Sequence, residues 1–170
     1  MYLKFVGGCL VCAASGYVGF SAGARLGKRV QALGQLIKAL EFMQNQITYI
    51  CQPMAQIIES LENTAQGTAR ELFGALGRRM GELGRTDFSS LWRECVSGLE
   101  GINQNDKNIL IELGQGLGRY DAEIEAKNIA TAIAGLEFNL EAAGQEHKKY
   151  AKMYRGFGLA FGLFVAILLF

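Results

Sequence analysis

Both ends of this 170-residue chain are long apolar runs, and these runs constrain its structure more than any other feature. Residues 5–24 contain no charged side chain, and a helix of this length covers about 30 Å, the thickness of the hydrocarbon core of a bilayer. Residues 153–170 contain one charged side chain, Arg155, which can reach the lipid headgroups from near the edge of the run. We therefore predict transmembrane segments at residues 1–24 and 153–170, the second slightly short, with a helical domain at residues 25–152.

Basic residues gather on the inner side of both apolar runs. An excess of Lys and Arg beside membrane spans marks the cytoplasmic face, so we predict a cytoplasmic domain with both termini on the other side of the membrane. The membrane-flanking basic residues are Arg25, Lys28, Arg29, Lys148, Lys149, Lys152 and Arg155.

The acidic residues lie in the middle of the chain. Residues 41–146 hold all sixteen of them against eight basic residues, a net charge of −8. We expect the end of the domain far from the membrane to be negative and to attract a basic partner surface. The candidate partner-facing residues are Glu59, Glu62 and Glu112.

Two other interpretations of the apolar runs stay open. The first run could be a signal peptide cleaved after Ala22-Gly23-Ala24, although the basic residues that follow it oppose export of the rest of the chain. The second run could be a buried core helix of a soluble domain.

Apolar residues between the runs recur in steps of three and four, and no segment alternates as a β-strand does. The sequence therefore predicts an all-α fold, an antiparallel bundle of about six helices whose two long outer helices continue into the membrane. The first is expected to reach about Ile50, with a buried stripe at Val30, Leu33, Ile37, Leu40, Ile47 and Ile50. The last is expected to start at Asp121, with a seam at Ile124, Ile129, Ile133, Leu136, Leu140 and Ala143.

Capping residues suggest where the shorter helices begin. Pro53 suits the first turn of a helix, and Thr68 with Glu71 fits a capping box. Asp87 can cap a fourth helix, and either Asn105 or Asp106 can cap a fifth.

Small residues recur every four positions in both predicted spans. In lipid such strips let helices approach closely, so we expect the spans to pack together or against the span of a partner; the alternative is that glycine is simply frequent in membrane helices. The candidate packing residues are Ser15, Gly19, Gly23, Gly27, Gly158, Gly162 and Ala166.

No constellation of side chains predicts catalysis. The only histidine, His147, lies among lysines, and no second metal ligand or nucleophile–base pair accompanies it. We predict no enzymatic activity, no metal and no cofactor.

Three segments in their order along the chain carry a resemblance to a known family: residues 25–33, residues 112–121 and residues 148–155. With them the chain resembles the stage III sporulation protein AB family over nearly its whole length. The resemblance implies a helical domain similar to the cytoplasmic domain of the inner-membrane platform proteins of type II secretion and type IV pilus systems.

The resemblance also implies a location and partners. The protein would lie in the mother-cell membrane around the forespore, in a secretion-like channel complex needed for spore formation. Its natural partner would be a motor ATPase, stage III sporulation protein AA, together with other members of the complex. Platform proteins typically carry two copies of the helical domain and this chain has one, so a homo-oligomer could supply the second.

Two further functions remain as alternatives. The chain could be an exported or tail-anchored helical interaction protein, which the mature N-terminus would reveal. It could also be a membrane-tethered signalling module, which would require an extracellular input domain for which the chain leaves no room.

Overall fold

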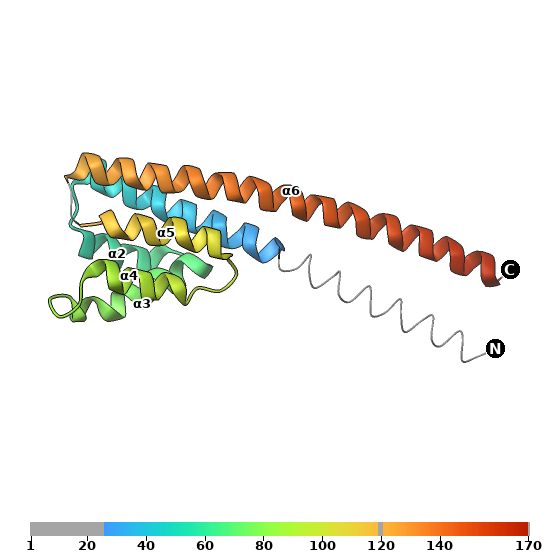
Figure 1. Cartoon of the computed structure of the whole chain (residues 1–170), viewed down its shortest axis with the longest axis horizontal. Coiled ribbons are helices and arrows are strands. Elements are labelled where there is room, and N and C mark those ends of the chain that lie inside the picture. Colours follow the sequence, from blue (N-terminus) through green and yellow to red (C-terminus); the bar gives the residue numbers. More distant parts are fainter. Residues whose placement is uncertain (1–25, 119–120, 170) are drawn as a thin grey trace. The chain divides into compact units, whose positions relative to one another are not determined.

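The structure is a computed structural model that describes residues 26–118 and 121–169, with side chains described for residues 26–118 and 121–149. This part of the chain is helical and contains no β-strand, which confirms the predicted all-α class (Figure 1). Its six helices span residues 26–45 (the first helix), Met54–Thr64 (α2), Gly67–Arg79 (α3), Phe88–Ser97 (α4), Gln104–Gly116 (α5) and Ala122–Leu169 (α6).

The chain divides into two compact units. The larger unit is Arg29–Glu141, and the smaller one combines Met1–Lys28 with Ala142–Phe170. Helices α2 to α5, most of the first helix and the part of α6 before residue 142 lie in the larger unit, so its packing determines how most of the described side chains are positioned.

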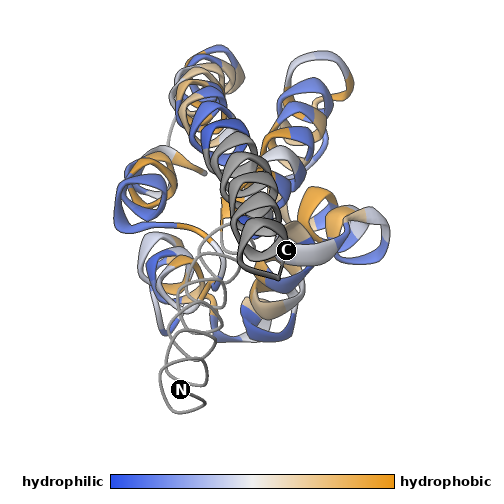
Figure 2. Ribbon diagram, turned by 90° about the vertical axis from the view of Figure 1, so that its right-hand side faces the viewer, coloured by the Kyte–Doolittle hydropathy of each residue, from blue (hydrophilic) through white to orange (hydrophobic). Residues whose placement is uncertain are grey.

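The core of the larger unit takes one apolar face from each of its helices. Figure 2 shows these faces turned toward one another, with hydrophilic residues outside. The predicted stripe of the first helix and the predicted seam of α6 both contribute to it, and most of their members are confirmed as buried. These buried members are Leu33, Ile37, Leu40, Ile47, Ile129, Ile133 and Leu136.

A π-helical turn, Gln46–Ile50, ends the first helix and explains one wrong prediction. The Gln46 carbonyl accepts hydrogen bonds from the backbone N–H groups of Cys51 and Gln52, so this turn holds more residues than an α-helical turn. The extra residue rotates the last residues of the turn away from the buried stripe. Ile50, predicted to be buried, is therefore 62% exposed.

The caps of α3 and α5 also differ from the predictions. The capping box expected at Thr68 and Glu71 is absent from α3; instead the Thr68 backbone N–H donates to Gln35 Oε1 of the first helix at 2.9 Å. In α5 the N-cap is Asn103, whose side chain forms a capping box with Asp106. The start of α3 is therefore held by tertiary packing, and the N-cap of α5 lies two or three residues before the predicted position.

The first helix and α6 run antiparallel within the larger unit. Gln44 Nε2 donates to the Ala126 carbonyl at 3.1 Å near one end. Toward the other end, Arg29 of the first helix and Asn139 of α6 bind the same carboxylate, that of Asp106. The residue order of these two contacts fixes the relative direction of the two helices.

The predicted membrane spans lie mostly outside the part of the chain that the structure describes. Residues 1–24 fall wholly outside it, and residues 153–169 continue α6 as backbone helix without described side chains. Among the residues that were described fully, no helix is both long and apolar enough to cross a membrane. The spans at both ends therefore stay predictions.

Helices α3, α4 and α5 meet at Trp92, which is fully buried. Its indole Nε1 donates to the Leu110 carbonyl at 2.6 Å, and its ring meets the edge of Phe73 with centroids 6.2 Å apart. Gly114 of α5 lies directly against the indole, so that a Cβ at this position would overlap the ring. The absence of a side chain at Gly114 therefore allows α5 to approach α4.

We expect Gly114→Ala to lower the free energy of unfolding by about 1–3 kcal/mol, because the added methyl group forces the Trp92 ring to move. Gly34→Ala is a matched control, since Gly34 is also helical but an added Cβ would meet no atom within 4 Å beyond its own stretch of helix. That control should gain about 0.5–1 kcal/mol from the better helix propensity of alanine. Urea unfolding of the purified full-length protein, followed by circular dichroism, measures both; equal effects of the two variants would contradict the packing described.

Candidate functional site

A buried carboxylate, that of Asp106 near the start of α5, joins three helices. Asp106 has no exposed surface, and four donors surround its two oxygens. Arg29 approaches through Nε at 2.8 Å and Nη2 at 3.0 Å, Asn139 Nδ2 donates at 2.8 Å, and the Asn103 backbone N–H donates at 3.0 Å. All four lone-pair positions of the carboxylate are therefore used.

The local sequence explains why Asp106 can occupy this position. Asp106 is the third residue of α5, and its carboxylate accepts a hydrogen bond from the backbone N–H of the N-cap Asn103, while its own N–H donates to Asn103 Oδ1 at 2.8 Å. This fixes the carboxylate at the helix start, where the helix dipole also favours negative charge. Arg29 then supplies the opposite charge from a position 77 residues away.

A second ion-pair cluster lies on the surface, around Arg79 at the end of α3. Its guanidinium binds Glu82 at 2.9 Å and Glu94 of α4 at 2.6 Å, and all three side chains keep substantial exposure. The hydrogen bond from Arg79 lowers the pKa of the Glu82 carboxyl. This cluster links the end of α3 to α4 at the surface, whereas the Asp106 cluster joins its helices in the interior.

The predicted membrane-flanking residues differ in their surroundings. Lys28, Lys148 and Lys149 are not buried, but Arg29 is held by Asp106 with 17% of its side chain exposed. The charge of Arg29 is therefore already paired inside the protein, which the sequence alone did not indicate. Arg25, Lys152 and Arg155 have side chains outside the described part.

Of the predicted packing residues, only Gly27 has described surroundings. A Cβ at Gly27 would lie 3.1 Å from Nε2 of His147, so within the smaller unit the first helix and α6 approach closely here. Gly158, Gly162 and Ala166 lie on the helical backbone of α6, and their surroundings are not described. The predicted small residues at 15, 19 and 23 fall outside the described residues.

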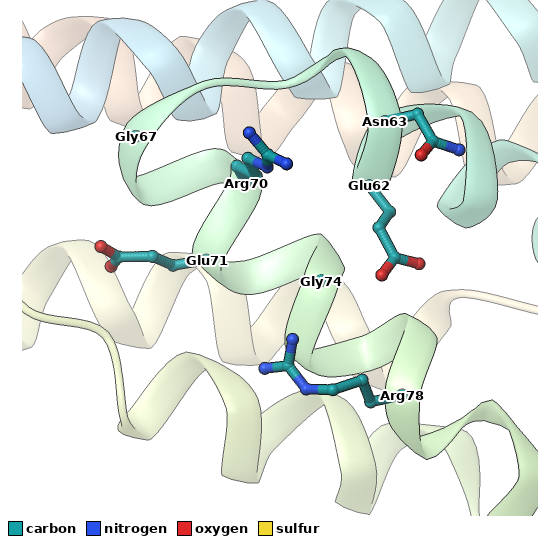
Figure 3. A pocket seen from close by; sticks show the side chains of 7 residues that line it. All are labelled: Glu62, Asn63, Gly67, Arg70, Glu71, Gly74 and Arg78. Carbon is teal, nitrogen blue, oxygen red and sulfur yellow. The ribbon is translucent and has the colours of Figure 1, made fainter.

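The three candidate partner-facing glutamates do not form one group. Glu59 and Glu112 are exposed on α2 and α5, but Glu62 is partly buried and lines a hollow between α2 and α3. Figure 3 shows Glu62 projecting from α2 toward α3. Two arginines, Arg70 and Arg78, and a second glutamate, Glu71, line the same hollow, so its formal charges sum to zero.

A second hollow lies between α5 and α6, and Glu112 lines it together with Gln115, Asn128 and Thr131. The two hollows share no residue. Among the described residues, no three His, Cys, Asp or Glu side chains gather closely enough to hold a metal ion. The predictions that the chain needs no metal and catalyses no reaction stay predictions.

A sequence model of the stage III sporulation protein AB family matches residues 4–170. The chain belongs to the stage III sporulation protein AB family. Stage III sporulation protein AB of Bacillus subtilis (strain 168) is 23% identical over 170 residues, a match that covers 98% of this chain and 99% of that protein. A solved structure of a stage III sporulation protein AB superposes with a TM-score of 0.63 at 21% identity, covering 71% of this chain and 97% of that one.

Membership of the stage III sporulation protein AB family confirms the resemblance seen in the sequence and assigns the chain a role in sporulation. The structural match shows that the helical fold is shared. The family is a sporulation family rather than a known family of enzymes, in keeping with a site made of structural ion pairs and surface contacts.

Sequence reasoning missed the Asp106 cluster. One sequence signal could have predicted part of this cluster, the capping box between Asn103 and Asp106. That signal is the pattern Asn103-x-x-Asp106 at the start of a segment with helical apolar periodicity. No signal in a single sequence pairs Arg29 with Asp106, or brings Asn139 to both of them.

We expect Arg29→Met to lower the free energy of unfolding by about 3–5 kcal/mol, because it leaves the buried Asp106 carboxylate without its cation. Adding Asp106→Asn to this variant should recover part of the loss, because the unpaired charge is then removed. Urea unfolding of the four members of this double-mutant cycle measures the coupling.

Arg79→Met is the matched control, since Arg79 also binds carboxylates, those of Glu82 and Glu94, but does so at the surface. Its effect should be much smaller than that of Arg29→Met. If the two arginine variants lose equal stability, the Asp106 cluster is not the interior anchor described here.

Proposed function

We propose that this chain is a membrane-anchored platform of a secretion-like complex between mother cell and forespore. In this role it holds a cytoplasmic motor ATPase, stage III sporulation protein AA, and other members of the complex in position. The observation that carries the proposal is the family match, which extends from residue 4 to residue 170 and so includes both apolar ends.

The membrane anchor is supported by the order of apolar and basic residues. Each apolar run has Lys and Arg on its inner side, and the flanking residues Lys28, Lys148 and Lys149 are not buried. Gly27 lies beside His147, so the two helices are close where the predicted spans approach their inner ends. Two helices that lie this close just inside the predicted spans suit anchoring in a common bilayer, with the helical domain in the mother-cell cytoplasm.

The scaffold role is supported by how the larger unit is held together. A fully bonded interior carboxylate fixes the first helix, α5 and α6 against one another. A scaffold has to hold its partners in fixed positions, and rigid elements do this better than loosely packed ones. A homo-oligomer that supplies a second helical domain belongs to the same proposal.

The predicted topology can be tested with single cysteines in a variant whose four native cysteines are replaced. We expect a cysteine at Glu100, in the loop between α4 and α5, to react with a membrane-impermeant maleimide only after permeabilisation. A cysteine added after Phe170 should react in intact cells. The protein is expressed in vegetative cells of an endospore-former, so that the far side of the membrane is open to the reagent.

Mass spectrometry of the mature N-terminus is the control for this experiment, because cleavage after Ala24 would mean an exported protein. A reversed labelling pattern, or a cleaved N-terminus, would contradict the platform proposal.

The ATPase contact can be tested by charge reversal. We expect Glu59→Lys/Glu62→Lys/Glu112→Lys to weaken binding of the purified ATPase at low salt, because it removes negative charge that steers a basic surface. The matched control reverses Glu100, Glu137 and Glu146, three exposed glutamates at other places, with the same change in net charge. The association rate of the ATPase is measured on the full-length protein immobilised in detergent, over a series of salt concentrations. Identical rates for both triple variants would show that these positions have no specific role.

A further inference from the structure

Phe138 is the most exposed large apolar side chain of α6 in the described part of the chain, with 74% of its surface accessible. Its neighbours Leu136 and Asn139 are buried, so the opposite side of the helix faces the core. Glu141, one turn further along, is exposed, and the exposed charged side chains of α6 up to this residue are three acidic and one basic. Phe138 is therefore an aromatic side chain on an acidic surface.

A surface that suits Phe138 in size and charge lies between α2 and α3. It is the hollow of about 520 Å³ that Arg70, Gly74 and Arg78 of α3 line at intervals of four residues, on one face of the helix (Figure 3). Gly74 leaves the place between the two arginines without a side chain. Within the described part of the chain, neither guanidinium forms an ion pair or a hydrogen bond.

Two glutamates also line the hollow, but neither occupies this place. The Glu62 carboxylate lies against the backbone of Gly77, where an added Cβ would overlap it. Glu71 projects away from Gly74, as Figure 3 shows. The space beside Arg70 is therefore open to a side chain from outside.

Phe138 and Gln35 of the first helix lie at nearly the same level along the bundle. The Gln44–Ala126 hydrogen bond aligns the first helix with α6. Gln35 precedes Gln44 by nine residues, and Gly135 follows Ala126 by nine. Because the two helices are antiparallel and rise equally per residue, Gln35 is level with Gly135, and Phe138 lies within one turn of it.

Gln35 in turn sets the level of the hollow. Its Oε1 accepts the Thr68 backbone N–H at 2.9 Å, and an added Cβ at Gly67, which lines the hollow, would overlap the same Gln35 side chain. The Arg70 end of the hollow is therefore level with the part of α6 that carries Phe138. The two surfaces face different sides, since Figure 1 shows α3 and α6 at opposite edges of the larger unit.

This placement rules out a contact within one molecule and fits a contact between two. Two matching surfaces that are level but lie on opposite sides can join copies head to tail, side by side, and such contacts close into rings when the rotation allows. A planar guanidinium stacks on an aromatic ring and pairs with a carboxylate, so Arg70 can receive both Phe138 and Glu141.

We propose that the larger unit binds a second copy of this chain through these two surfaces. Phe138 of one copy enters the hollow of the next with its ring against the Arg70 guanidinium, and Glu141 pairs with the same guanidinium. The inference rests on the proposed function, because it names the surfaces of the homo-oligomer included there. The aromatic contact holds the copies together, while the charges set their orientation.

Sedimentation equilibrium of the full-length protein in detergent tests the aromatic contact. Phe138→Ser should raise the Kd of self-association about tenfold or more, the usual effect of removing an interface anchor. Ile124→Ser is the matched control, since Ile124 is also an exposed apolar residue of α6, and it should leave the Kd unchanged. Circular dichroism checks that both variants remain folded. A wild-type protein that stays monomeric, or equal effects of the two variants, would overturn the inference.

A charge exchange tests the pairing of Glu141 with Arg70 by the same measurement. Glu141→Arg and Arg70→Glu should each weaken self-association several-fold, because each places like charges opposite one another, and the double variant should recover most of the loss. Glu123→Arg, at an exposed position near the start of α6, is the charge control, and adding Arg70→Glu to it should bring no recovery. A double variant as weak as its single parents would refute the pairing.

Crosslinking shows whether the contact is head to tail. In a background without the four native cysteines, a Phe138→Cys copy and an Arg70→Cys copy are mixed and treated with a short bis-maleimide. Mixed dimers are expected, and neither copy alone should crosslink to itself. Dimers of the Phe138→Cys copy alone would mean a symmetric contact and contradict the inference. The ATPase takes no part in these experiments, so the topology and charge-reversal tests above decide the proposed function separately.

Discussion

The Asp106 carboxylate is the point on which the arrangement of the larger unit depends. A buried charge is costly unless an opposite charge and hydrogen bonds replace the water it has lost. Here Arg29, Asn139 and the Asn103 backbone supply four donors within 3.0 Å. Since these donors come from the first helix, α6 and the start of α5, the carboxylate is satisfied only when all three elements are in register.

Such a cluster selects one arrangement more than it adds stability. Apolar stripes such as those of the first helix and α6 can slide past one another with modest loss, because hydrophobic contact is not directional. A carboxylate that needs four donors cannot slide, since any shift by a turn leaves it buried and unpaired. We infer that the apolar stripes bring the helices together and that Asp106 fixes their relative positions.

The same distinction explains which features the sequence could predict. Periodicity over several turns identified all six helices and most buried positions, including Leu33, Ile37 and Leu136, because burial of a helix face repeats locally in the sequence. The errors have long-range or single-residue causes. The Gln35 contact that begins α3, the pairing of Arg29 with Asp106 and the π-helical turn before Cys51 leave no periodic signal.

The net charge of the domain could be predicted from the sequence, but the surroundings of each charged side chain could not. The net charge of −8 in residues 41–146 is a property of the sequence, yet individual carboxylates serve different purposes in the structure. Asp106 is interior, Glu125 is buried and accepts the Gly118 backbone N–H at 2.6 Å, and Glu62 shares a hollow with two arginines. The candidate glutamates therefore differ in burial and in local charge, although all three carry the same formal charge.

The interior cluster also fixes the end of the larger unit that lies far from Asp106. Ile50 and Ile124 stay 62% and 46% exposed there, although both continue apolar stripes that the core accepts elsewhere. The two residues come from helices far apart in the sequence, so they keep the same relative positions only while those helices keep their register. The Asp106 cluster toward one end and the Gln44–Ala126 hydrogen bond near the other maintain that register.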